Sequence, residues 1–172
     1  SGGVKNVYFA VYDQVLSTTV NVDEITDIDM GTSSLYKYVM PLGVASLTDT
    51  ITGSRENGTV FFTPTVNIIL NRLTKEDQNE IKLLAQTKLV IFAELNATLA
   101  SNGHTVIVCL GRVNGMELNA GTMDSGAAFG DRGGYTLTFD GLETEPFIMV
   151  KDYTATPFDN ADSSNPIPII SA

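Results

Sequence analysis

The segment TVFFTPTVNIILNRLTKEDQNEIKLLAQTKLVIFAE, Thr59–Glu94, decides the fold class because it places a helix pattern between two strand patterns. Both of its ends are rich in β-branched and aromatic residues, which is typical of strands. In the middle, Thr74 can cap a helix whose first turn carries Glu76 and Asp77, where acidic groups complement the helix dipole. An apolar stripe at helical spacing then follows: Ile81, Leu84 and Ala85. We expect a helix at about residues 75–86 that packs by one face on a sheet.

Most of the remaining chain reads as short strands separated by turns. Apolar or alternating runs predict strands at Val4–Val15, Leu16–Val22, Leu35–Met40, Ala45–Ile51, Val60–Leu70, Leu89–Leu95, Thr105–Leu110, Tyr135–Asp140 and Pro146–Val150. Asn102–Gly103, between two of these runs, is a strong hairpin signal. The acidic segment Asp23–Gly31 and the glycine-rich segment Asn119–Gly134 are expected to be loops. The pattern predicts a mainly β protein whose sheets carry one packed helix.

The length of 172 residues suits one domain with a real hydrophobic core. The final segment, Lys151–Ala172, contains three prolines and no basic residue after Lys151, which is typical of an extended arm or a disordered tail. We therefore expect a β domain at residues 1–150, followed by a C-terminal arm at residues 151–172.

The composition limits the classes of function. The formal net charge of −10 argues against a dedicated grip on nucleic acid, because phosphate contacts depend on clustered Lys and Arg. It does not argue against a surface past which nucleic acid slides without being held. No apolar run approaches the roughly 18–20 residues that span a bilayer, and no signal peptide pattern is present, so we expect no membrane partner.

Residues for catalysis are scarce. Cys109 is the single cysteine and lies in the apolar run TVIVCLG, which predicts a buried side chain and excludes an intramolecular disulfide. His104 is the single histidine and follows the Asn102–Gly103 turn, where an exposed side chain is the ordinary outcome. With no second His or Cys nearby, His104 cannot anchor a zinc site. Nucleophile-elbow, P-loop and dinucleotide patterns are missing.

Three weaker patterns remain as hypotheses. Asp124–Ser125–Gly126 matches the signature of retroviral-type aspartic proteases, in which two copies of a chain pair their carboxylates. The acidic residues Glu24, Asp27 and Asp29 resemble a calcium loop, but the glycine and glutamate positions of an EF-hand fail. The aromatic residues of Tyr8–Tyr12 and Tyr36–Tyr38 could stack on single-stranded nucleic acid, although core or interface packing is the better explanation without basic residues around them.

Two segments together carry a resemblance to a known family. They are Thr52–Glu94, with its order of strand, helix and strand, and Gly111–Phe147, which ends in the closing-strand pattern GDRGGYTLTFDGLE. In type and order of elements they resemble tail-tube proteins of tailed bacteriophages, including the ring-forming tail proteins of crAss-like phages. The two segments cover just under half of the chain, and the first fifty residues match only loosely.

The resemblance implies a fold and a mode of assembly. The implied fold is a two-sheet β-sandwich or barrel with one flanking helix and extended terminal arms. Family members assemble into rings, commonly sixfold in tail tubes and twelvefold in some crAss-like rings, and the rings stack into a channel for DNA ejection. Terminal arms and a long loop between strands make the contacts, here the segments Lys151–Ala172 and Thr48–Thr59.

The sequence thus predicts a structural virion protein of a phage tail that forms a ring or tube, with itself and neighbouring tail or portal proteins as partners. Double-stranded DNA would pass through without specific binding. We expect no catalytic activity, no cofactor and no catalytic, cofactor-binding or metal-binding residue. The alternatives are another virion component on a similar fold (a head–tail connector, baseplate or decoration protein), a homodimeric protease that uses Asp124, and a carbohydrate- or calcium-binding β-sandwich module.

Overall fold

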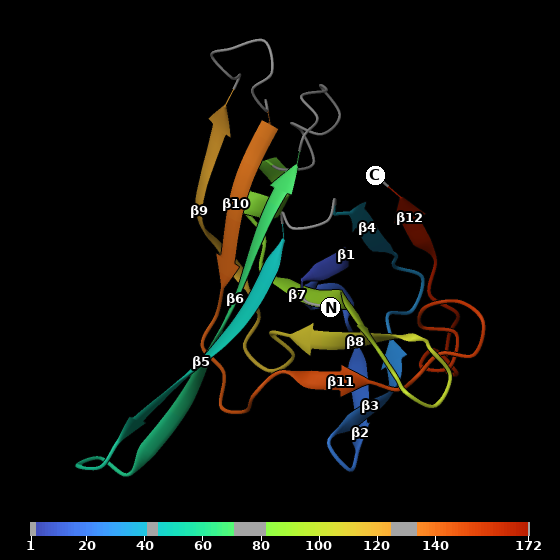
Figure 1. Ribbon diagram of the computed structural model, residues 1–172, viewed down its shortest axis with the longest axis horizontal. Coiled ribbons are helices and arrows are strands. Elements are labelled where there is room, and N and C mark those ends of the chain that lie inside the picture. The colour runs from blue at the N-terminus through green and yellow to red at the C-terminus, as the bar shows by residue number, and fades with distance from the viewer. Residues whose placement is uncertain (1–2, 41–44, 71–81, 125–133, 172) are drawn as a thin grey trace.

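The computed structural model describes the chain except for residues 1–2, 41–44, 71–81, 125–133 and 172. Over these described residues the protein is mainly β, with two sheets and one short helix, and the sheets do not close into a barrel (Figure 1). The predicted fold class, a two-sheet β-sandwich or barrel with one helix, is confirmed. Because the sheets are not closed, the fold is the sandwich rather than the barrel. The described part of the helix covers residues 82–85, inside the predicted range 75–86, whereas its predicted cap Thr74 lies outside the described residues.

The larger sheet contains eight strands in the order β12-β4-β1-β7-β8-β11-β3-β2. Most neighbours are antiparallel, but β12 runs parallel to β4, and β11 runs parallel to β3. The strands are β1 (Val4–Val11), β2 (Ser17–Asn21), β3 (Glu24–Asp29), β4 (Leu35–Val39), β7 (Leu89–Thr98), β8 (Thr105–Leu110), β11 (Ile148–Val150) and β12 (Ile169–Ser171), and a 3-10 turn, Tyr12–Gln14, follows β1.

The smaller sheet contains four antiparallel strands in the order β5-β6-β10-β9. They are β5 (Ser46–Ser54), β6 (Thr59–Leu70), β9 (Glu117–Asp124) and β10 (Gly134–Asp140). The sheet lies across one face of the larger sheet and leaves its own second face to solvent (Figure 1).

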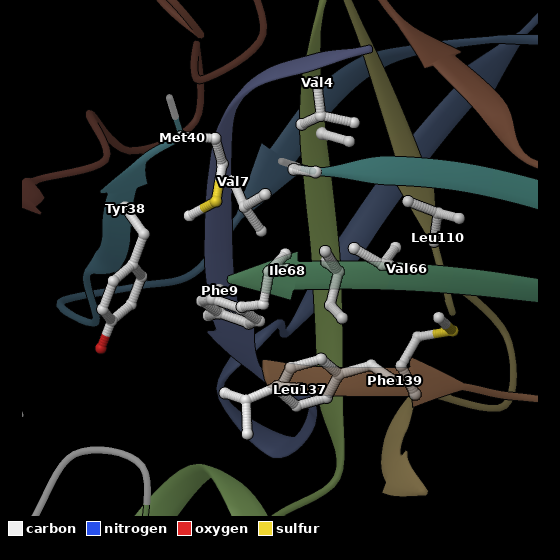
Figure 2. Close-up of a cluster of buried hydrophobic side chains, with 14 of the residues drawn as sticks. Val4, Val7, Phe9, Tyr38, Met40, Val66, Ile68, Leu110, Leu137 and Phe139 are labelled. Atoms are coloured by element: carbon white, nitrogen blue, oxygen red, sulfur yellow. The ribbon is translucent and has the colours of Figure 1, made fainter. Parts of the chain in front are cut away.

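The main core fills the space between the two sheets. Val7 and Phe9 of β1 point from the larger sheet towards Val66 of β6 and Phe139 of β10, as Figure 2 shows. The rings of Phe9 and Phe139 lie 5.3 Å apart between centroids. Because strand side chains alternate, Tyr8 and its neighbour Ala10 point the other way, into a second buried cluster on the far face of the larger sheet.

The C-terminal segment covers this second cluster, so the prediction of an extended arm or disordered tail is wrong for its described residues. Phe158 is fully buried, and its ring packs edge-on against Tyr8 and Phe92 at centroid distances of 5.0 and 5.3 Å. Ile167 is also buried, and β12 then pairs with β4. At the other end of the described chain, Gly3 leads directly into β1, which begins at Val4 in the interior of the larger sheet.

Two predicted loops are strands in the structure. Within Asp23–Gly31, β3 places Ile25 and Ile28 in the core. Within Asn119–Gly134, residues up to Asp124 belong to β9, which pairs with β10, and the remainder up to Gly133 lies outside the described residues. The other predicted strands are present, and β7 and β8 form the expected hairpin with Gly103 at a φ of 74°.

Candidate functional site

The protease signature is only partly described by the structure. Asp124 is the last residue of β9 and lies opposite Gly134 of β10, whereas Ser125 and Gly126 lie outside the described residues. The segment therefore follows an edge strand.

The acidic residues of the calcium hypothesis hold the C-terminal segment instead. Asp27 accepts hydrogen bonds from the hydroxyls of Ser163 and Ser164 at 3.0 and 2.6 Å, and Asp29 accepts one from Asn165 Nδ2 at 2.8 Å. The hydrogen bonds from Ser164 in particular lower the pKa of Asp27. Within the described ranges, no group of three or more His, Cys, Asp and Glu side chains is placed to hold a metal ion.

The single histidine also contacts the C-terminal segment. The His104 ring stacks on Tyr153 with centroids 4.6 Å apart. Its Nδ1 lies 2.8 Å from the Tyr153 carbonyl oxygen and 3.4 Å from Asp152 Oδ1. The prediction of a simply exposed side chain is therefore wrong, because the ring is part-buried. Cys109 is buried, as predicted, and burial raises the pKa of its thiol well above the ordinary value.

The strongest polar cluster surrounds Glu94, which sequence reasoning missed. Glu94 is only 3% exposed, and its carboxylate accepts hydrogen bonds from Asn6 Nδ2, Tyr8 OH and Thr105 Oγ1 at 2.9, 2.9 and 2.8 Å. Lys5 Nζ adds a charge 3.9 Å away. Burial and the Glu94 charge raise the pKa of Tyr8 strongly. The signal was available, because a lone acid in the run LVIFAEL must find partners when it is buried. Every donor is matched, so the cluster ties strands together.

The tyrosines of the stacking hypothesis are packing residues. Tyr8 is fully buried, and Tyr38 lies in the main core beside Phe9, at 5.3 Å between ring centroids. Tyr12 donates its hydroxyl hydrogen bond to the Val113 carbonyl oxygen, and Lys88 Nζ lies 5.3 Å from the centroid of its ring. This agrees with the prediction that core packing is the better explanation.

The surface that stands out is the smaller sheet, because both of its edges are open. Among the described residues, β5 pairs only with β6 and β9 pairs only with β10, so the outer backbone groups of each edge strand have no strand partner there. The nine-residue β5 and the eight-residue β9 contain no proline, lysine or arginine, which natural edge strands use to block pairing, although β5 carries one inward-pointing charge, Asp49. Because the four strands alternate in direction and two of them lie between the edges, β5 and β9 run in opposite directions.

The solvent face of this sheet is mostly polar. One row across the four strands is Ser46, Asn67, Thr138 and Ala120, and neighbouring rows add Thr48, Thr65, Asp140 and Glu117 on one side and Ile69, Thr136 and Thr122 on the other. Thr138 Oγ1 donates a hydrogen bond to Asn67 Oδ1 at 2.8 Å. None of the four strands contains a basic residue in its sequence. The result is a face of short, mostly neutral polar side chains.

A hairpin of β5 and β6 projects past the rest of the molecule (Figure 1). Its last contact with the body is a pair of backbone hydrogen bonds between Phe62 and Glu143, of 2.9 and 2.8 Å. Glu143 is itself buried, and burial raises the pKa of its carboxyl group. Further along the hairpin, Ile51, Val60 and Phe61 are exposed. This projection includes the segment Thr48–Thr59, which the resemblance implies as a long contact loop, but in the structure most of the segment belongs to β5.

In the part of the chain that the structure describes, no helix is long and apolar enough to cross a membrane. Comparison of the chain with protein-family models, with curated proteins and with solved structures finds no match.

Proposed function

We propose that this chain is a structural virion protein whose copies associate side by side into a ring of a bacteriophage tail, around a channel through which DNA is ejected. The observation that carries the proposal is the smaller sheet, with two edge strands that the described residues leave unpaired on one side and four strands free of basic residues. The family resemblance of Thr52–Glu94 and Gly111–Phe147 supplies the context of a phage tail. The role needs no cofactor, metal or catalytic residue.

The geometry of the edges favours a closed assembly. Since β5 and β9 run in opposite directions, β9 of one copy can pair with β5 of the next and continue the antiparallel pattern. Such a contact joins two different surfaces, so it repeats head to tail and closes into a ring when the rotation allows. The edges are also staggered, because β5 extends into the projecting hairpin, whereas β9 extends towards Gly134. A sheet that closes on itself requires a stagger of this kind.

The solvent face suits the wall of a channel for DNA. A continuous sheet made of these strands would turn its Thr-rich face to the lumen and its larger sheet outward. Strong DNA binding requires Lys and Arg contacts to phosphates, and this face offers hydroxyls, amides and the carboxylates of Asp140 and Glu117. Together with a net charge of −10, such a wall would let a duplex pass without holding it.

Mass photometry of edge variants tests the proposal. We expect the wild-type protein to form closed multiples, and the double variant Thr48→Asp, Thr50→Asp to remain monomeric, because charge added to β5 would repel the neighbouring β9, which carries Glu117 and Asp124 in its sequence. Both threonines are exposed, so folding is expected to persist. The matched control, Gln14→Asp with Val22→Asp beside the edge strand β2 of the other sheet, should assemble normally, because both side chains are exposed and lie outside the pairing of β2 with β3. A strictly monomeric wild type, or a β5 variant that assembles fully, contradicts the proposal.

A further inference from the structure

One face of the projecting hairpin is apolar and uncovered. On this face, Ile51 lies opposite Phe62, and Gly53 lies opposite Val60. Further back on the same face, Asp49 lies opposite Pro64 and accepts a hydrogen bond from the Phe147 N–H, and Leu47 and Val66 then belong to the core. Past the end of the larger sheet no described residue covers this face, so Ile51 and Val60 are 69% and 58% exposed. A two-stranded hairpin is marginally stable in water without a packed layer, so this face is suited to contact in an assembly.

An apolar pocket lies at the far end of the molecule. It has a volume of about 300 Å³ and is formed by β1, β4, the start of β7 and the short helix at residues 82–85. Its lining includes Phe9, Val11, Tyr36, Tyr38, Leu84 and Leu89. Leu83 on the rim is 65% exposed. The volume is at the lower limit for ligand pockets and suits one or two large apolar side chains.

The hairpin and the pocket cannot meet within one molecule. They lie at opposite ends of β6, and this 12-residue strand spans about 40 Å at 3.3 Å per residue. A convex apolar surface and an apolar pocket at opposite ends of one chain form a heterologous pair, which repeats head to tail and builds an open stack when successive copies are displaced along one axis.

Charge also favours a second copy as the occupant. Two copies that each carry a net charge of −10 repel each other over most of their surfaces. The hairpin segment from Thr50 to Phe62 contains one basic and one acidic residue, Arg55 and Glu56, and is therefore neutral. The residues that line the pocket are all uncharged. This pair of surfaces is thus one at which two acidic copies can approach closely.

We propose that the apolar face of the β5–β6 hairpin, with Ile51, Val60 and Phe62, docks into the Phe9–Tyr36–Leu84 pocket of a second copy. The inference rests on the proposed self-assembly and specifies its axial contact: edge pairing of β5 with β9 builds a ring, and this contact stacks one ring on the next. A single copy or ring exposes hairpins at one end and pockets at the other.

Electron microscopy of two single variants and a control tests the contact. Val60→Asp places a charge on the hairpin, and Leu83→Asp places one on the pocket rim. Both positions are exposed, so folding is expected to persist. Each variant should yield single rings where the wild type yields stacks, and a mixture of the two should yield pairs of rings, since one junction is then intact. The control Leu16→Asp, at a leucine 66% exposed on the other edge of the larger sheet, should stack like the wild type. Stacking that persists in both variants, or a control that fails to stack, would overturn the inference while the rings themselves still support the proposed function.

A cysteine trap gives a readout that does not depend on ring formation. One copy carries Val60→Cys and the other Leu83→Cys, and the native Cys109 is buried and does not compete. On mild oxidation we expect a covalent heterodimer in the mixture, and little product when Leu16→Cys replaces Leu83→Cys. Equal yields from the two pairs would refute the docking contact. Absence of rings in the wild type together with a specific crosslink would instead refute the proposed function alone.

Discussion

At the scale of single residues, Glu94 is the polar centre of an otherwise apolar interior. Its carboxylate accepts hydrogen bonds from β1 through Asn6 and Tyr8, and from β8 through Thr105, whose hydroxyl also lies 3.0 Å from Tyr153 OH. A buried carboxylate costs free energy unless hydrogen bonds compensate it, and here three donors and Lys5 do so. The register of the central strands and the start of the C-terminal segment therefore depend on one side chain.

Replacing Glu94 by alanine should reduce the free energy of unfolding by about 3 kcal/mol, because buried donors lose their acceptor. Urea denaturation at a protein concentration low enough to suppress assembly measures this loss. Glu56→Ala, at an exposed position in the hairpin, provides the control and should change the free energy by less than about 0.5 kcal/mol. An equal effect at both positions would show that the Glu94 cluster has no special role.

Asp27 gives a prediction about pH. Its pKa is lowered in the folded state, mainly by hydrogen bonds from Ser164, so its contribution to stability is complete above the unfolded value of about 3.9. The contribution is lost as the pH falls through the lower folded pKa. Asp159, held by backbone N–H groups of Thr156, Thr154 and Ala155, acts in the same direction. Glu143 acts in the opposite direction, because its raised pKa contributes stability at low pH that is lost as the pH rises.

We expect Asp27→Asn to flatten the decline of unfolding free energy between pH 4 and pH 2, since one proton-linked group is removed. Urea titrations across this range measure the slope for the wild type and the variant. The exposed Asp13 provides the comparison, and Asp13→Asn should leave more of the slope intact. Identical slopes for the wild type and Asp27→Asn would contradict the role assigned to the Ser163 and Ser164 contacts.

At the scale of elements, the C-terminal segment acts as a third layer on the larger sheet. It is held by Phe158 between Tyr8 and Phe92, by Asp27 and Asp29, and by β12 beside β4. Phe158 adopts a φ of 70°, which is uncommon for a bulky residue and is offset here by complete burial of its side chain.

Phe158→Ala should cost about 3–5 kcal/mol, the usual range for a large aromatic side chain lost from a core. Limited proteolysis should then cut within residues 151–171 before the rest of the chain. The control Phe61→Ala concerns a ring on the exposed hairpin and should be nearly neutral for the free energy of unfolding of the monomer. A Phe158→Ala variant as stable and as resistant as the wild type would contradict a packed third layer.

These elements also show what the sequence could reveal. The apolar runs of β1, β6 and β7 are long enough to identify strands directly. Strand β3 was missed because a bulge opposite Thr19 and Val20 lets Ile25 and Ile28, three residues apart, face the same core and hides the two-residue period. Strand β9 does not show a strand pattern because Gly121 stands at one of its inward positions. A Cβ at this position would lie 3.0 Å from the Leu137 side chain, so glycine fits this close contact.

The C-terminal layer and the Glu94 cluster could not be predicted from sequence patterns for another reason. Phe158 and Ile167 show no periodicity, and only tertiary contact with the larger sheet buries them. The partners of Glu94 lie 11 to 88 positions away along the chain, so a single acid in an apolar run indicates that partners exist without identifying them. The helix at residues 82–85, by contrast, follows from local spacing alone.

At the scale of the whole molecule, the two sheets have different roles. The larger sheet is covered on both faces, by the smaller sheet and by the C-terminal layer. The smaller sheet has one free face and two free edges, and its hairpin extends beyond the body (Figure 1). Unprotected edges promote uncontrolled aggregation unless a specific partner occupies them. We infer that neighbouring copies occupy these edges. In a ring, the unpaired backbone groups of β5 and β9 would then form hydrogen bonds with each other.

Class averages from electron microscopy of the purified wild-type protein at high concentration test this central claim most directly. The account predicts closed rings of uniform size with a central hole, lined by the Thr-rich face of the smaller sheet and surrounded by the larger sheet. Particles of monomer size alone, or rings whose lumen is lined by the larger sheet, would contradict it.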